Sequence, residues 1–172
     1  MLTKLEQRKY QAYTISTYTF STFYTTLPHT LIEVKLTQLI EKKIAREKKL
    51  FLACNAERAF LTNDTFKHYM MWTCPDVCKS LSFLLDNIYV RFGDTVYCQV
   101  IGIPMGTNCA PLDADLFLYC YEKDFMLSLK SDTQAGILEA FNDTSRYLDD
   151  IFNIYNPFLT LCFLSYTRKS GI

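Results

Sequence analysis

The amino-acid sequence predicts one domain of the α+β class, a small antiparallel sheet with helices packed on one face. Strand-like stretches, helical periodicities and a hairpin signal are mixed along the chain, which is typical of this class. The 172 residues suffice for one domain with a sizeable core and are too few for two ordinary ones. The composition, 49% hydrophobic and 21% charged, is that of a globular protein and not of a disordered one.

The first part of the chain contains one expected strand and one expected helix. Residues 13–20 are rich in Thr, Tyr and Ile, which favour a strand. A turn at 27–29 follows. Apolar residues at helical spacing then predict an amphipathic helix over 29–48: Ile32, Leu36, Leu39, Ile40 and Ile44. The stretch 50–71 is ambiguous, with short strand-like pieces.

A second helix and a hairpin are expected next. Thr73 suits the N-cap position of a helix and Pro75 suits its first turn. The helical period of apolar residues continues to about residue 88. Gly93-Asp94 then separates two short strand-like stretches, which is the signal of a two-residue hairpin turn.

Charge and cysteine usage indicate which partners and cofactors to expect. The net charge is zero, so the chain as a whole lacks the basic balance expected of a nucleic-acid enzyme. Positive charge gathers in residues 42–49, where alternation with Glu suits a solvated helix face. The seven Cys include no CxxC pair, so no structural zinc is expected. An odd thiol count and the lack of an apolar run of about 20 residues predict a soluble, intracellular protein without a membrane partner.

Asp149 and Asp150 lie between two strand-like segments, 146–148 and 151–154, and are therefore expected at a tight turn. Two carboxylates brought together by a turn favour a divalent cation, which offsets their repulsion. An Asp pair is also ordinary in hairpin turns that bind nothing. Taken alone, the pair is explained more simply by turn chemistry.

A rigid loop precedes another expected helix, over 110–130. Two Gly and two Pro occur within residues 102–111, and Pro111 suits the first turn of that helix. Such a loop brings backbone close to a ligand, and a helix start favours phosphate. The loop is neither a P-loop nor a GxGxxG motif. Taken alone, it is explained equally well as a structural connection between a strand and a helix.

Three blocks, in this order, resemble the reverse transcriptase domain of retroelements, most closely that of Penelope-like polymerases. The first block is FSTFYTTLPH at 20–29. The second is GIPMGTNCAP at 102–111 with ADLFLY at 114–119, and the third is RYLDD at 146–150. Residues 83–93 also look like this group. The resemblance covers about 13 to 157, and three ordered blocks together are specific.

The resemblance implies a polymerase palm over residues 1–157, with fingers and thumb largely missing, and a divergent C-terminal tail over 158–172. It implies RNA-directed DNA synthesis, in which Mg²⁺ ions serve nucleotidyl transfer from deoxynucleotides to a primer on an RNA or DNA template. Asp149 would be the principal metal ligand and Asp150 its weaker companion. Tyr24 would be the steric gate against ribonucleotides. The nucleotide and the templating base would contact Gly102, Pro104, Met105 and Gly106.

The sequence departs from the family pattern at Thr19, the position of the first metal-binding Asp. A neutral hydroxyl cannot supply the charge that bridges two cations, so this departure predicts an inactive, degenerate copy. Asp113 stands where the family has an apolar residue, on an otherwise apolar helix face. The alternative is a non-catalytic remnant that binds nucleic acid or a protein partner. The resemblance also predicts Thr19 and Asp149 on neighbouring antiparallel strands, with Cα atoms within about 12 Å against a strand spacing of about 4.8 Å.

Overall fold

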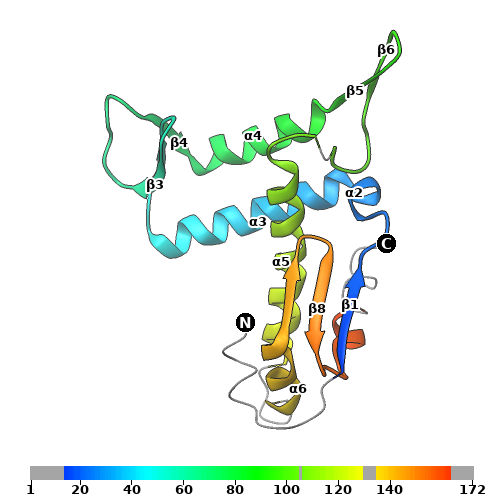
Figure 1. Cartoon of the computed structure of the whole chain (residues 1–172). Coiled ribbons are helices and arrows are strands. Elements are labelled where there is room, and N and C mark those ends of the chain that lie inside the picture. The colour runs from blue at the N-terminus through cyan, green and yellow to red at the C-terminus, as the bar shows by residue number, and fades with distance from the viewer. Residues whose placement is uncertain (1–13, 105, 130–134, 164–172) are drawn as a thin grey trace. The chain divides into compact units, whose positions relative to one another are not determined.

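The computed structural model describes residues 14–104, 106–129 and 135–163 (Figure 1). The chain divides into two compact units, Thr22–Tyr121 and the combination of Met1–Ser21 with Glu122–Ile172. Helices and short strands are mixed in the described residues, so the predicted α+β class is confirmed. In place of the single expected sheet, the described residues form three small antiparallel sheets.

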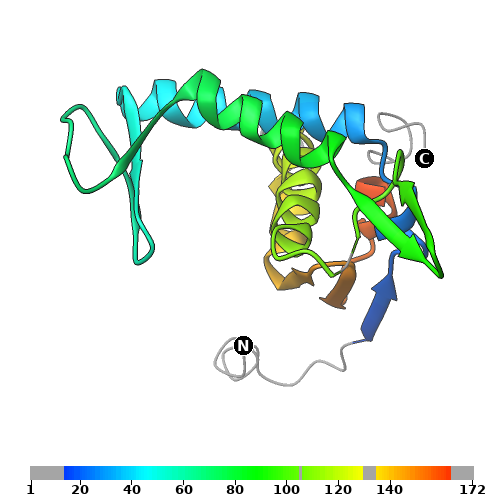
Figure 2. The ribbon, with the colours of Figure 1, turned by 90° about the horizontal axis from the view of Figure 1, so that it is seen from above.

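The unit Thr22–Tyr121 is built on two antiparallel helices that lie side by side (Figures 1 and 2). A short helix α2 (Phe23–Thr26) leads through Pro28 into α3 (His29–Glu47), and α4 (Cys74–Asp86) runs back along α3. The predicted apolar stripes face the interior, because Ile32 and Leu36 of α3 and Leu81 and Leu85 of α4 are buried. Both helices begin where the sequence predicts and end within two residues of the expected position.

Caps and turns explain where the elements of this unit begin. The Thr73 side chain accepts a hydrogen bond from the Asp76 backbone N–H, and the Asp76 carboxylate accepts one from the Thr73 N–H, which makes a capping box at the start of α4. The predicted N-cap is therefore confirmed.

The stretch 50–71, which the sequence left ambiguous, contributes to a three-stranded antiparallel sheet of order β3-β2-β4. Its strands are β2 (Phe51–Cys54), β3 (Ala59–Thr62) and β4 (Met70–Thr73).

The predicted hairpin and the third long helix complete the unit. Strands β5 (Tyr89–Phe92) and β6 (Thr95–Cys98) pair across Gly93-Asp94, and Gly93 supplies the positive φ, 60°, that such a turn needs. Helix α5 (Ala110–Ser128) begins with Pro111 in its first turn and continues into the second unit. Its buried residues within Thr22–Tyr121 include Ala110, Ala114, Phe117, Leu118 and Tyr121.

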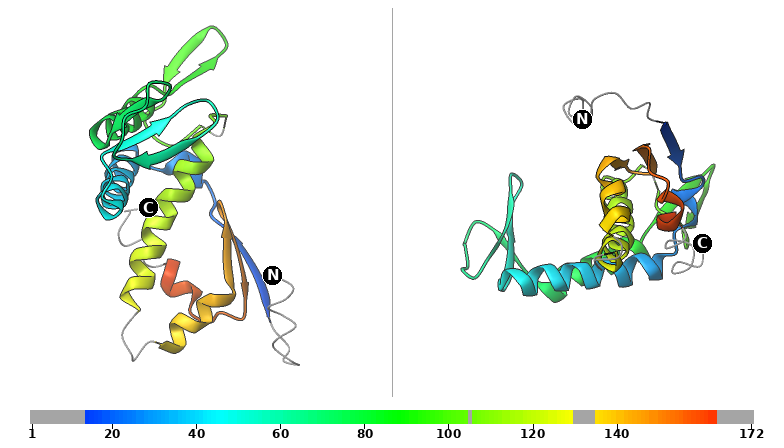
Figure 3. Two further views of the ribbon diagram at one scale, coloured as in Figure 1. Left: turned by 90° about the vertical axis from the view of Figure 1, so that its left-hand side faces the viewer. Right: turned by 90° about the horizontal axis from the view of Figure 1, so that it is seen from below.

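The second unit contains a three-stranded antiparallel sheet of order β1-β8-β7 (Figure 3). Its strands are β1 (Ile15–Thr19), β7 (Thr144–Tyr147) and β8 (Asp150–Ile154), and β7 is preceded by α6 (Ala135–Ala140) and the 3-10 helix η2 (Phe141–Asp143). A short helix at 159–163 brings Phe163 edge-on against the rings of Tyr18 and Phe20. The rest of the expected tail, 164–172, lies outside the described residues.

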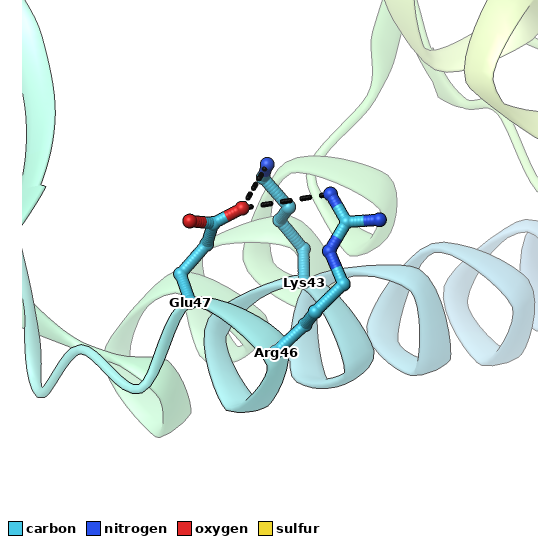
Figure 4. Close-up of polar contacts among 3 residues, drawn as sticks. All are labelled: Lys43, Arg46 and Glu47. Atoms are coloured by element: carbon cyan, nitrogen blue, oxygen red, sulfur yellow. Dashed lines mark hydrogen bonds and ion pairs between the residues drawn. The ribbon is translucent and has the colours of Figure 1, made fainter.

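The basic cluster near the end of α3 lies on a solvated helix face, as its alternation with Glu predicts. Glu47 accepts an ion pair of 2.7 Å from Lys43, one helical turn earlier, and a longer one of 3.5 Å from Arg46 (Figure 4). The neighbouring Lys43 ammonium lowers the pKa of the Glu47 carboxyl. Within the described ranges, no helix combines the length and the apolar character that crossing a membrane requires.

Candidate functional site

Thr19 and Asp150 face each other across two neighbouring strands, although 131 positions separate them. The Thr19 hydroxyl donates a hydrogen bond of 2.6 Å to Oδ1 of Asp150. Just beyond this pair, the Phe20 N–H donates a 3.0 Å bond to the Asp149 carbonyl. Standard bond lengths then put the Cα atoms of Thr19 and Asp149 less than about 9 Å apart. The prediction that these two strands are antiparallel neighbours is therefore confirmed. The residue directly opposite Thr19 is Asp150, not Asp149.

The turn between β7 and β8 contains Leu148 and Asp149, not the two Asp residues that the sequence suggested. Asp150 is the first residue of β8 and pairs with Tyr147 on one side and Thr19 on the other. The prediction that both carboxylates lie in the turn is therefore wrong by one residue. A two-residue hairpin needs a positive φ, and Leu148 supplies it at 53°. For a residue with a Cβ this conformation costs about 1–2 kcal/mol.

Arg146 holds this strained turn in place. Its guanidinium donates to both carboxylate oxygens of Glu122 on α5, with an Nη2 to Oε2 distance of 3.1 Å. Its Nη1 donates a 2.9 Å bond to the Leu148 carbonyl. The Arg146 side chain is only 10% exposed, so this forked contact is largely shielded from water. We infer that Arg146 positions the turn that carries Asp149, a role that sequence reasoning did not assign.

The residues at this turn fit one loosely held Mg²⁺ ion better than a fixed pair of ions. Mg²⁺ binds through one or two carboxylates and keeps several waters, so Asp149 and Asp150 are suitable ligands. Thr19 adds a neutral hydroxyl, which already engages one oxygen of Asp150. Throughout residues 14–104, 106–129 and 135–163, no three or more His, Cys, Asp or Glu side chains form a group able to hold a metal.

The predicted nucleotide loop is anchored to the segment that carries Tyr24. Gly102 donates from its N–H to the Leu27 carbonyl at 2.8 Å, and the Ile103 N–H donates to the Tyr24 carbonyl at 2.6 Å. A Cβ at position 102 would lie 2.6 Å from the Tyr24 carbonyl oxygen, and φ is +82°. Only glycine therefore allows this close approach of two backbones. The structure brings Tyr24 and Gly102 together within one unit.

His29 fixes the same loop from the first turn of α3. Its Nε2 lies 2.6 Å from the Gly102 carbonyl oxygen, which can only accept, so Nε2 carries the hydrogen. His29 is the last residue of the first sequence block, and the sequence alone assigns it no role. Nothing local could have identified its partner, because Gly102 lies 73 positions away.

The other predicted nucleotide-contacting residues of this loop are Pro104, Met105 and Gly106. The Pro104 carbonyl accepts two bonds of 3.1 Å from Thr107, through its N–H and its hydroxyl. Gly106 is exposed, and a Cβ there would meet nothing within 4 Å. Met105 lies outside the described residues. Tyr24 and this loop belong to Thr22–Tyr121, whereas Thr19, Asp149 and Asp150 belong to the other unit.

Asp113 is buried in the first turns of α5, as its apolar neighbours predicted, and only 9% of it is exposed. Burial raises the pKa of its carboxyl, and a hydrogen bond from the Cys109 thiol opposes that rise. Position 113 therefore places a carboxyl in poorly hydrated surroundings. No protein-family model matches this chain, and a search of curated proteins returns no match.

Proposed function

We propose that this chain derives from the palm of a retroelement reverse transcriptase, an RNA-directed DNA polymerase, and that it has lost catalysis. The observation that carries the proposal is the juxtaposition of Thr19 with Asp150 on adjacent antiparallel strands. The resemblance requires the first and third sequence blocks to meet in this way around metal ions. Local propensity gives no reason for two segments so distant in sequence to pair.

A second observation supports the same origin. The second sequence block, through Gly102, packs its backbone against Tyr24 in the first block. In the proposed ancestor the Tyr24 ring excludes the 2′-hydroxyl of a ribonucleotide. Gly102, Pro104, Met105 and Gly106 contact the incoming deoxynucleotide and the templating base.

The proposed chemistry assigns distinct tasks to the residues of the β7–β8 turn. Asp149 and Asp150 hold Mg²⁺, with Asp149 as the principal ligand. When bound in such a site, magnesium supplies charge that activates a primer 3′-hydroxyl and stabilises the leaving pyrophosphate. Arg146 keeps Asp149 at the tip of the turn through the Leu148 carbonyl. These tasks depend on a set of carboxylates that anchors two ions.

Thr19 is the reason to propose inactivity. An ionised Asp would contribute a negative charge opposite Asp150, where the chain has a neutral hydroxyl donor. The remaining two carboxylates suit a hydrated, weakly held ion. Without a third carboxylate, these residues would hold a pair of divalent ions poorly, and the rate of nucleotidyl transfer should be lower by orders of magnitude.

Manganese binding and primer extension test the two halves of the proposal separately. Paramagnetic Mn²⁺ should broaden amide NMR signals at 19–20 and 148–151, and Asp149→Asn should abolish that broadening. Glu139→Gln, which removes a carboxylate of α6, is the control and should leave the broadening unchanged. Broadening centred elsewhere, or none at millimolar Mn²⁺, would contradict a palm-type metal site.

The primer-extension assay uses the native chain with a primed RNA template, deoxynucleotides and Mg²⁺. We expect no extension above the level of the Asp149→Asn variant. Robust extension that Asp149→Asn abolishes would overturn the proposed inactivity and support the polymerase origin. The two assays together therefore distinguish a degenerate site from a misassigned one.

The alternative is a remnant that binds nucleic acid without catalysis. The observation in its favour is the basic end of α3, where exposed Lys43 and Arg46 share a single Glu47. Binding of single-stranded RNA that weakens steeply with salt, and that a Lys43→Gln, Arg46→Gln variant loses, would support it. Asp149→Asn should leave such binding unchanged.

A further inference from the structure

A cavity of about 710 Å³ lies within the unit Thr22–Tyr121. Its walls come from the end of α4, the start of β5, the loop after Ile103 and the first turn of α5. Cavities that bind small molecules typically measure about 300–1,000 Å³. Leu84 and Tyr89 on its wall are 48% and 61% exposed, so the cavity communicates with solvent.

The lining is mostly apolar, with one acidic group. Hydrophobic side chains form most of the walls: Leu84, Leu85, Ile88, Tyr89, Ile103 and Pro104. Polar groups come from Asn87, Thr107, Asn108 and Cys109. Among the lining residues that the structure describes, Asp113 is the only one with a charged side chain, and none is Lys, Arg or His.

Asp113 lacks a cationic partner among the described residues. The Cys109 thiol is the one group that offsets the effect of burial on its carboxyl pKa, and a thiol is a weak donor that here also lies 3.8 Å from the Thr107 hydroxyl. A carboxylate that is nine-tenths buried without an opposite charge is unfavourable. A ligand that brings a positive charge to this position would remove that penalty.

We propose that this cavity is a binding site for a small organic cation, an aromatic or aliphatic body that carries a primary ammonium group. The body packs against Leu85, Ile88 and Ile103, and the ammonium pairs with the Asp113 carboxylate. An ammonium has three donors, so it also bonds the side-chain oxygen of Asn87 or Asn108. This inference does not depend on the proposed polymerase origin.

The same lining excludes phosphate-bearing ligands. A nucleotide carries negative charge, which the Asp113 carboxylate repels and which no basic side chain of the described lining offsets. Pro104 and Gly106 line the cavity, and they also belong to the loop that is proposed to contact a nucleotide. The negative charge of the lining therefore argues against a triphosphate in this cavity.

Three probes that share one body test the charge requirement. These are 2-naphthylmethylamine, 2-naphthylmethanol and 2-naphthoic acid, which are cationic, neutral and anionic at pH 7.5. Their dissociation constants for the native chain are measured by ligand-observed NMR titration. We expect the amine to bind about tenfold more tightly than the alcohol, a ratio equal to ~1.4 kcal/mol. The acid should bind more weakly than the alcohol.

Two variants show whether Asp113 is the source of that preference. Asp113→Asn keeps the side-chain shape and removes the charge, so the amine and the alcohol should bind within twofold of each other. Asp86→Asn removes an exposed carboxylate on α4 that does not line the cavity, and it should preserve the tenfold ratio. Removal of a buried charge does not threaten folding, and circular dichroism checks that both variants fold.

Several outcomes would overturn the proposal. Equal affinity of the native chain for the amine and the alcohol would show that Asp113 does not select charge. A preference that persists in Asp113→Asn would assign it to another carboxylate. Tighter binding of the naphthoic acid, or no binding of any probe at millimolar concentration, would exclude a cation site in this cavity.

Discussion

The Thr19 hydroxyl donates a 2.6 Å hydrogen bond to the Asp150 carboxylate, across the β1–β8 pairing. This bond joins the residue that precedes the first sequence block to the third block, and it does not neutralise the Asp150 charge, because the hydroxyl has none. In the proposed ancestor, two acidic residues face each other across this strand pair. In this chain, a hydrogen-bond donor faces an acceptor. The chain gains a hydrogen bond at the place where two carboxylates would repel each other.

Thr19→Asp should tighten Mg²⁺ binding by about tenfold, because a further carboxylate at the same site strengthens cation attraction. Without metal, the variant should lose about 0.5–1 kcal/mol of stability, since like charges then face each other. Calorimetric titration with Mg²⁺ and urea denaturation with and without the ion measure both effects. Primer extension should remain slight.

Thr17→Asp is the matched control for that substitution. Thr17 is exposed on β1 and lies opposite Phe152, two residues from Thr19. An added carboxylate there should leave Mg²⁺ affinity nearly unchanged. Equal Mg²⁺ affinity of the native chain and Thr19→Asp would mean that position 19 does not face the metal ligands.

Gly102→Ala should destabilise the protein by about 3 kcal/mol. The new Cβ would meet the Tyr24 carbonyl oxygen at 2.6 Å and adopt a φ of +82°. Gly106→Ala, in the same loop, meets nothing within 4 Å and should change stability by less than about 0.5 kcal/mol. Urea denaturation measures both, and similar losses for the two variants would contradict the close approach of the backbones.

Arg146→Lys should cost about 1–2 kcal/mol and speed amide exchange in the β7–β8 hairpin. Lysine keeps the charge but loses the forked contact with Glu122 and the bond to the Leu148 carbonyl. The exposed ion pair of Lys43 with Glu47 on α3 is the control. Glu47→Gln should have no measurable effect on stability, because exposed ion pairs contribute little. Hydrogen exchange by NMR and urea denaturation test the prediction. An unchanged hairpin would remove Arg146 as a positioning residue.

Asp113→Asn should stabilise the protein by about 1 kcal/mol at pH 7, because it removes a buried charge. Burial raises the carboxyl pKa in the folded state above the ordinary value of 3.8. The folded state then binds more protons than the unfolded state, so the unfolding free energy of the native chain falls as pH rises from 3.8 through the raised pKa.

The variant should lack that fall in unfolding free energy. The advantage of Asp113→Asn should therefore disappear below pH 3.8, where the carboxyl is protonated whether folded or not. Urea denaturation of both proteins across the pH range provides the comparison. A constant difference between them at every pH would mean that Asp113 does not titrate in a buried setting.

The sequence by itself determined the local elements. Thr73 and Pro75 predict the start of α4, Gly93-Asp94 predicts the β5–β6 turn, and Pro111 predicts the start of α5, because capping and turn conformations depend on a few neighbouring residues. It also placed Asp113 on an apolar helix face, since helical periodicity defines a face, and the structure shows that this residue is buried. These features need no knowledge of distant parts of the chain.

Only the tertiary structure decided which distant residues meet. It placed Asp150 in β8 and left Leu148 with Asp149 in the turn, because the hairpin register depends on pairing with β1 as well as β7. The contacts of Arg146 with Glu122 and of His29 with Gly102 join residues 24 and 73 positions apart. Such contacts follow from how whole elements pack, and no local pattern of residue types encodes them.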